Sequence, residues 1–176
     1  MHGATLGIIG EGAIGQGTAA IGRAFGMRVL FADHPPPKMQ GVEFTPLDGV
    51  LAQSDVISLH CPLLPATRNL IDLDAFRKMK RNALLINTAR GGLVNETALV
   101  AALKSGMISG AGFDVVTQEP MPLDHPFQEI LSHPGFVLTP HVAWASDEAI
   151  QALADQLVDN IAAFQAGNPR HVVSLA

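Results

Sequence analysis

The chain has 176 residues and a net charge of −5, and 48% of its residues are hydrophobic. This composition supplies a substantial core for one domain, and 15% charged residues leave no basic footprint for nucleic acid or an anionic membrane. The single cysteine, Cys61, excludes an intrachain disulfide, and no metal site is expected. Because no basic segment followed by an apolar run opens the chain, we expect a cytoplasmic protein without a membrane span.

Short apolar runs alternate with helical patterns through the first half of the chain. The helical pattern after the first strand places Ile14, Thr18, Ile21 and Phe25 on one side, and Gly26 is a typical helix stop. Three prolines in 34–38 predict a loop. The pattern predicts strands at 5–10, 28–33 and 55–60, and helices at 13–26 and 47–53.

The alternation continues through the second half. A Pro-containing loop is expected at 117–126, and the basic cluster at 76–81 is interpreted as the solvated face of a helix. Ser146 is the predicted cap of a long amphipathic last helix, whose apolar stripe runs from Ile150 to Phe164. The pattern predicts helices at 73–79, 95–106 and 146–167, and strands at 83–88, 110–115 and 136–141.

The predicted strands are continuous apolar runs, which is typical of strands covered by helices on both faces. Strands and helices alternate from one end of the chain to the other. The sequence therefore predicts an α/β domain with a doubly wound, mainly parallel sheet. We expect this domain to span residues 1–168, followed by a tail at 169–176.

A glycine-rich turn joins the first predicted strand to the first predicted helix. Gly10 permits the tight turn, Gly12 lets the backbone approach a pyrophosphate, and Gly15 lets the helix pack closely on the strand. Asp33 closes the second predicted strand, where a carboxylate binds the adenosine ribose and repels a 2′-phosphate, favouring NAD over NADP. The alternative is a tight strand–helix turn with an ordinary surface Asp.

Three further side chains follow predicted strands and suit one chemistry. Arg90, Glu119 and His141 would meet at the carboxyl edge of a parallel sheet, beside the cofactor. There the guanidinium would grip a carboxylate and polarise a carbonyl, the imidazole would donate a proton, and the Glu would orient the imidazole. This set predicts hydride transfer to a 2-keto acid. Taken singly, Arg90 could form a sheet-end salt bridge, Glu119 a turn, and His141 a strand cap.

Four long segments of the chain follow one family pattern. They are LGIIGEGAIGQ, HCPLLPATRNLID, INTARGGLVNETALVAALKSGMISGAGFDVVTQEP and LTPHVAWAS. Through them the chain resembles the NAD-dependent D-isomer-specific 2-hydroxyacid dehydrogenases over nearly its whole length. The resemblance implies a Rossmann-type fold, with Arg90, Glu119 and His141 as catalytic residues. It also implies that Asp33 binds the ribose and that Asp114 holds the nicotinamide amide.

The remaining cofactor contacts are expected around the glycine turn and after two later strands. Within the family, PHVAW with Trp144 is most similar to the glyoxylate/hydroxypyruvate reductase and glycerate dehydrogenase branch. The cofactor residues are expected to be Gly10, Gly12, Ala13, Ile14, Gly15, Cys61, Pro62, Thr88, Ala89 and His141.

Family members carry most of a substrate-binding domain before the strand that here begins at Thr5. We therefore expect the cofactor half of a two-domain enzyme, which binds NAD but is weakly active or inactive alone. The family also implies a homodimer formed through the cofactor domain, with segments such as 117–134. The alternatives are a non-catalytic NAD-binding module or truncated fragment, and an assembly role.

Overall fold

The structure of the protein is a computed structural model that describes residues 1–33 and 44–173. The loop predicted at 34–38 lies outside the described residues. The chain divides into two compact units, Met1–Pro140 and His141–Ala176. The predicted boundary at residue 168 separates the nucleotide-binding fold from its tail. The division into compact units does not test that boundary, so it stays a prediction.

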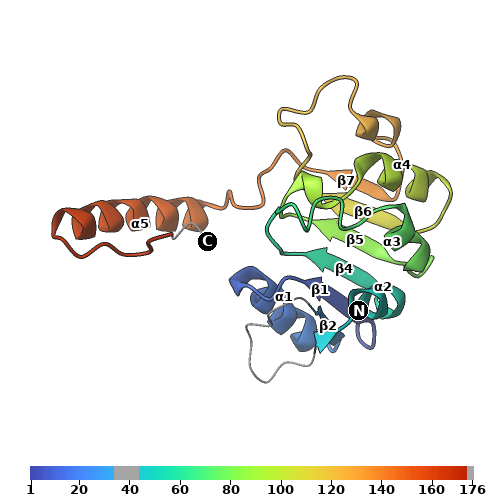
Figure 1. The fold of residues 1–176 in the computed structure, drawn as a ribbon, viewed down its shortest axis with the longest axis horizontal. Helices are drawn as coiled ribbons and strands as arrows, with labels where there is room; N and C mark the ends of the chain where they lie inside the picture. The colour runs from blue at the N-terminus through green and yellow to red at the C-terminus, as the bar shows by residue number, and fades with distance from the viewer. Residues whose placement is uncertain (34–43, 174–176) are drawn as a thin grey trace. The chain divides into compact units, whose positions relative to one another are not determined.

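One parallel sheet of seven strands organises the first unit. The strand order is β3-β2-β1-β4-β5-β6-β7, and each neighbouring pair is parallel (Figure 1). The doubly wound parallel sheet predicted from the sequence is thus confirmed, and only the short β3 was not predicted. The strands are β1 (Thr5–Ile9), β2 (Arg28–Ala32), β3 (Phe44–Thr45), β4 (Val56–Leu59), β5 (Leu84–Asn87), β6 (Gly110–Phe113) and β7 (Phe136–Leu138).

Helices connect the strands as crossovers. Asp72 and Asn95 cap α3 and α4 by accepting a hydrogen bond from a backbone amide in the first turn. Helices α2, α3 and α4 follow one another along one side of the sheet (Figure 1). The helices of this unit are α1 (Ala13–Ala24), α2 (Leu47–Gln53), α3 (Leu73–Lys78) and α4 (Glu96–Lys104), with 3₁₀ turns η1 (Gly91–Leu93) and η2 (Pro126–Glu129).

Strand β1 is buried on both faces because its residues alternate between two cores. Leu6 and Ile8 pack with Ala19 of α1 in a small cluster. Ile9 belongs to the larger cluster together with Val50 of α2. Since successive side chains of a strand point to opposite faces, α1 and α2 cover opposite sides of the sheet. This burial on both faces explains the continuous apolar strand sequences.

The apolar stripe of α1 is not the face that packs against the sheet. Ile14, Ile21 and Phe25 are more than half exposed, whereas Gly15, Ala19 and Gly22 are buried. The reason is space, because a Cβ at Gly22 would lie 2.7 Å from Leu6 Cδ2. Small residues bring this helix close to β1, which overrides the larger apolar side chains.

The basic cluster at 76–81 is only in part a solvated helix face. Arg77 and Lys78 are exposed, but Phe76 and Met79 are buried in the core. Helix α3 ends at Lys78, so Lys80 lies beyond it. The cluster mixes core and surface residues because the helix packs on α2 and α4.

The second unit consists mainly of α5 (Asp147–Gln165) and the chain that follows it. Ser146 caps α5 by accepting a hydrogen bond from Ala149 N at 3.1 Å, as predicted. The apolar stripe of α5 is not buried, since none of the residues of this helix is buried. The tail turns back along the helix, where His171 Nδ1 lies 3.0 Å from Asn160 Oδ1. No helix among the described residues combines the length and apolarity needed to span a membrane.

Asp55 holds three strands together at their amino ends. Its Oδ2 accepts from Thr5 N at the start of β1, and its Oδ1 accepts from Lys80 Nζ, each at 2.8 Å. Its own carbonyl accepts from Leu84 N at the start of β5. The Lys80 ammonium, and then the Thr5 amide, lower the pKa of the Asp55 carboxyl below its usual range.

We expect Asp55→Asn to lower the free energy of unfolding by about 1–2 kcal/mol at neutral pH, because it removes a charge-assisted hydrogen bond. The pKa of Asp55 is lower in the folded state than in the unfolded state. The stabilisation is therefore fully present when the pH is above the usual Asp pKa, and it is lost as the pH falls through the folded-state pKa. Urea unfolding of both proteins at pH 7 and at about pH 3 measures the difference. Asp74→Asn, which removes an exposed partner of Arg77, should cost less than about 0.5 kcal/mol; equal losses would contradict this assignment.

Candidate functional site

The candidate residues of the first unit all follow the carboxyl ends of strands. Gly10 follows β1, Asp33 follows β2, and Cys61 lies just beyond β4. Arg90 and Asp114 follow β5 and β6. Parallel strands end at one edge of their sheet, so one edge presents all of these residues. The strand order reverses between β1 and β4, which is where such folds bind ligands.

The three glycines of the first turn meet different surroundings. A Cβ at Gly10, whose φ is +107°, would lie 2.6 Å from Cys61 N. A Cβ at Gly15 would lie 2.0 Å from Gly10 O. A Cβ at Gly12 would meet no protein atom within 4 Å. The first and third glycines are therefore required by the fold, whereas the second leaves an open approach to the turn.

The open approach lies at the N-terminus of α1. Gly12 is the N-cap residue and provides no side chain to cap the first turn, where Ala13 and Ile14 lie. The first amides of an α-helix have no acceptor within the helix, and the helix dipole favours an anion there. The turn thus fits a pyrophosphate on two grounds, open space and available donors.

Asp33 lies one strand away from this turn. It is exposed, and its backbone amide donates to Thr45 O at 2.8 Å. Strand β2 pairs in parallel with β1, with Ile8 opposite Phe31, so the carboxylate and the glycine turn share the same edge. This is the location at which a ribose-binding acid lies in a dinucleotide-binding fold.

The segment after β4 presents uncharged groups. Burial raises the pKa of the Cys61 thiol and lowers the pKa of the His60 imidazole. Thr67 fixes the turn that follows, since its hydroxyl donates to Pro62 O and accepts from Leu64 N, both at 2.7 Å. Thr67 was not predicted as a structural residue from the sequence, although a Thr two residues after a Pro, here Pro65, is a recognisable turn signal.

Asn87 fixes the loop that carries Arg90. Its side chain is fully buried at the end of β5, where Nδ2 donates to Arg90 O at 2.9 Å and Oδ1 accepts from Ala89 N at 3.1 Å. Thr88 and Arg90 are exposed on this loop, and Arg90 Nη1 donates to Ala89 O at 2.6 Å. Sequence reasoning missed Asn87, whose signal is an Asn directly at a strand end.

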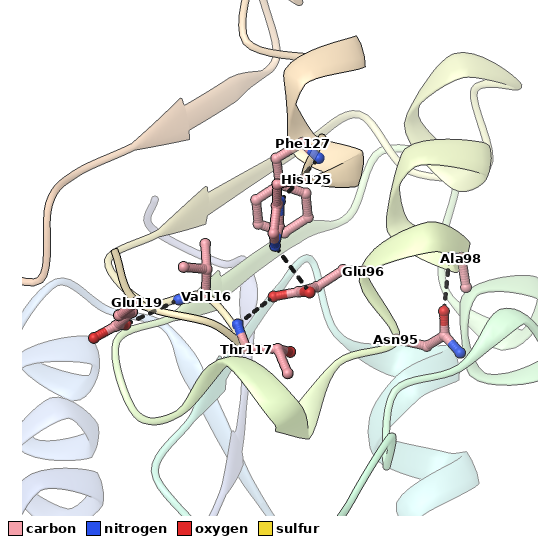
Figure 2. A network of polar contacts seen from close by, with 8 residues as sticks. All are labelled: Asn95, Glu96, Ala98, Val116, Thr117, Glu119, His125 and Phe127. Atoms are coloured by element: carbon pink, nitrogen blue, oxygen red, sulfur yellow. Dashed lines mark hydrogen bonds and ion pairs between the residues drawn. The ribbon is translucent and has the colours of Figure 1, made fainter. Parts of the chain in front are cut away.

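The loops after β5 and β6 pack directly against each other. A Cβ at Gly91 would lie 2.1 Å from the carbonyl carbon of Val116, so only a glycine allows this approach. Asp114 is buried between the strand ends and accepts a hydrogen bond from the Thr139 hydroxyl beyond β7. Glu119 is exposed, and its Oε1 accepts from Val116 N at 3.1 Å (Figure 2). The structure therefore brings the loops of Arg90 and Glu119 together.

His141 is the first residue of the second unit. Its φ is 57°, in the left-handed region, and its carbonyl accepts from Trp144 Nε1 at 2.9 Å. His has a several-fold enrichment in this region compared with most residues. The meeting of His141 with Arg90 and Glu119 stays a prediction.

A parallel sheet, an open glycine turn at a helix N-terminus and an acid at the end of the next strand define a dinucleotide-binding domain. The model of the family "D-isomer specific 2-hydroxyacid dehydrogenase, NAD binding domain" matches residues 1–143. The chain belongs to this family.

Similar proteins of the family are reductases and dehydrogenases of small acids. A glycerate dehydrogenase of Methylorubrum extorquens is 56% identical over 97% of this chain and 53% of its own length. A glyoxylate reductase of Korarchaeum cryptofilum is 44% identical over 95% of this chain and 51% of its own length. The chain thus spans about half the length of the curated relatives it matches.

Solved structures with a similar fold cover nearly the whole chain. The structure of a D-lactate dehydrogenase with NAD⁺ from Lactobacillus jensenii has a TM-score of 0.87 and 32% identity, covering 98% of this chain and 56% of that one. An acyclic imino acid reductase in complex with NADPH and D-Arg has a TM-score of 0.88 and 36% identity, covering 98% of this chain and 54% of that one.

We expect Gly12→Ala and Gly15→Ala to separate cofactor binding from folding. The methyl group at residue 12 would meet only a bound pyrophosphate, so NADH affinity should fall at least about tenfold while the free energy of unfolding changes by less than about 1 kcal/mol. The methyl group at residue 15 would clash with Gly10 O, which should cost about 1–3 kcal/mol of stability. Isothermal titration measures the NADH affinity, and urea unfolding measures the stability. A loss of stability in Gly12→Ala as large as that in Gly15→Ala would refute the assignment.

Proposed function

We propose that the chain is the cofactor-binding half of an oxidoreductase that transfers a hydride between NAD(H) and a small 2-keto or 2-hydroxy acid. The observation that carries this proposal is the exposed Arg90, which the buried Asn87 holds at the sheet edge that also carries the open glycine turn. A guanidinium fixed there offers a paired hydrogen-bond fork to a substrate carboxylate.

Three residues have named roles in the proposed reaction. Arg90 binds the carboxylate of the 2-keto acid and polarises the neighbouring carbonyl. His141 donates a proton to that carbonyl oxygen during reduction and accepts it during oxidation. Glu119 orients the imidazole. The bound nicotinamide cofactor supplies or receives the hydride.

The cofactor proposed is NAD rather than NADP. The Asp33 carboxylate accepts hydrogen bonds from the ribose hydroxyls and repels a 2′-phosphate. We assign the pyrophosphate to the turn at 10–15, with Ala13 and Ile14 in its first helical turn, and the nicotinamide amide to Asp114. The segments around Cys61, Pro62, Thr88 and Ala89 line the rest of the path, and His141 completes it.

The substrate class proposed is glyoxylate, hydroxypyruvate or a similar acid. Relatives named glycerate dehydrogenase, glyoxylate reductase and hydroxypyruvate reductase, 41–56% identical to this chain, support this class. A cytoplasmic homodimer through the cofactor domain is part of the same proposal. Since the chain spans about half of these relatives, we expect the 176-residue chain alone to bind NADH and to turn over slowly or not at all.

A non-catalytic NAD-binding module is the second candidate, and the same half-length coverage favours it. The two candidates differ in one observable, because only the enzyme uses Arg90. The deciding measurement is the reduction of glyoxylate by the complete gene product. The enzyme candidate requires that this activity is lost when Arg90 is substituted and retained when a surface arginine is substituted.

The cofactor proposal predicts that NADH binds the chain with micromolar affinity and more tightly than NADPH. In Asp33→Ala we expect NADH affinity to fall about tenfold and the preference over NADPH to shrink, because the carboxylate both binds the ribose and repels the phosphate. Isothermal titration of both cofactors into both proteins measures the change. Equal affinity for the two cofactors in the wild type would overturn the assignment of Asp33.

The catalytic proposal predicts distinct losses in the complete gene product. His141→Asn should lower kcat by about 10²–10⁴, because the proton donor is removed. Arg90→Lys should raise KM for the keto acid and lower kcat, because an ammonium cannot form the paired fork. Arg77→Lys, on the exposed face of α3, is the control and should keep both constants. A kcat of His141→Asn equal to that of the wild type would contradict the role of His141 as proton donor.

A further inference from the structure

A nearly buried carboxylate and imidazole lie beside the loop that carries Glu119. Glu96, the first residue of α4, has a side chain only 11% exposed, and the His125 side chain is 4% exposed. Glu96 Oε2 and His125 Nε2 are 3.0 Å apart (Figure 2). No sequence pattern pairs His125 with Glu96, which lies 29 residues earlier. The catalytic residues proposed above do not account for this pair.

Every polar atom of the pair has a defined partner. Glu96 Oε1 accepts from Thr117 N at 2.6 Å, and His125 Nδ1 accepts from Phe127 N at 3.1 Å. Because Nδ1 is an acceptor, the imidazole carries its proton on Nε2 and donates it to Glu96. The carboxylate therefore accepts two donors that lie at opposite ends of one loop, at residue 117 and residue 125.

The Glu96 carboxylate binds the backbone amide next to the one that binds Glu119. Val116 N donates to Glu119 Oε1, and the next amide along the chain, Thr117 N, donates to Glu96 (Figure 2). The same peptide packs against the Arg90 loop, since a Cβ at Gly91 would lie 2.3 Å from Thr117 N. The Glu96 carboxylate thus fixes the backbone segment that holds Glu119.

Stability alone does not explain a charged group here. The His125 ring packs edge-on against Phe127, with centroids 4.9 Å apart, in an aromatic cluster with Phe113 and Phe136. In such surroundings an apolar pair of similar volume is often as stabilising as an ion pair. A carboxylate that accepts two defined donors instead gives the loop one geometry, which a catalytic loop requires.

We propose that Glu96 and His125 are positioning residues that hold the 117–125 loop, so that this loop presents Glu119 in one geometry. This inference rests on the proposed function, because it assigns Glu119 a catalytic task. Neither residue contacts the reacting atoms; both act through the amide of Thr117 and the loop end at His125.

The test compares Glu96→Gln with the wild type in the complete gene product. Glutamine has one acceptor and one NH₂ group, so it opposes an N–H donor either at Thr117 or at His125. We expect kcat with glyoxylate to fall about tenfold while the Kd of NADH stays within twofold. His125→Gln, which keeps an N–H donor toward Glu96, should retain more than a third of kcat, whereas His125→Leu should match Glu96→Gln.

The matched control is Glu129→Gln. Glu129 pairs with Lys104, so this ion pair also joins α4 to η2, but both of its side chains are more than half exposed. We expect kcat and the Kd of NADH to be unchanged in this variant. A loss equal to that of Glu96→Gln would mean that any disturbance between α4 and η2 lowers the rate, and would overturn the inference.

A double-mutant cycle with Glu119→Gln separates positioning from stability. If Glu96 acts through Glu119, adding Glu96→Gln to Glu119→Gln lowers kcat by less than twofold. Independent, multiplicative losses overturn the inference. Amide hydrogen exchange of Val116 and Thr117 should accelerate at least tenfold in Glu96→Gln and stay unchanged in Glu129→Gln, and this readout does not depend on activity. Unchanged exchange in Glu96→Gln also overturns it.

The outcomes distinguish this inference from the proposed function. A complete wild-type gene product that binds NADH and reduces no 2-keto acid overturns the proposed function, and the catalytic part of this inference with it. An active wild type whose Glu96→Gln variant keeps its kcat overturns this inference alone.

Discussion

The parallel alignment of one sheet is the constraint on which every candidate residue of the first unit depends. Seven parallel strands end at one edge, and the strand order reverses between β1 and β4. The glycine turn, Asp33 and Arg90 are far apart in sequence, and the sheet alone places them at the same edge. At the opposite edge, Asp55 joins the starts of β1, β4 and β5, so the strands are tied together away from the site.

Polar side chains hold the loops that carry the candidate groups. Asn87, which is buried, hydrogen bonds to the backbone on both sides of the Ala89–Arg90 peptide, and the partly exposed Thr67 fixes the turn after Pro62. Glu96 accepts hydrogen bonds from the Thr117 amide and the His125 ring. Loops lack the regular backbone hydrogen bonds of helices and sheets, so a side chain with two partners gives each loop a single geometry. The exposed side chains would contact ligands, and these supporting side chains would determine their positions.

Much of the fold could be predicted because strand burial, glycine stops and helix caps are local signals. The Ser146 cap lies where the sequence predicted it. The packing face of α1 could not be predicted from its apolar stripe, since the close contact of Gly22 with Leu6 depends on the distance between helix and sheet. The partner of His125 is 29 residues away, at Glu96, and no periodic pattern connects residues across such a loop.

The differing surroundings of the glycines in the first turn bear on how a lineage with this fold would change. Gly10 and Gly15 are held by the protein's own backbone, and selection for folding alone would preserve them. A Cβ at Gly12 would meet no protein atom within 4 Å, so selection for a glycine there comes from the ligand alone. A descendant that abandoned its nucleotide would keep the outer two glycines and lose the middle one, and the residue at that position would record whether the nucleotide is still in use.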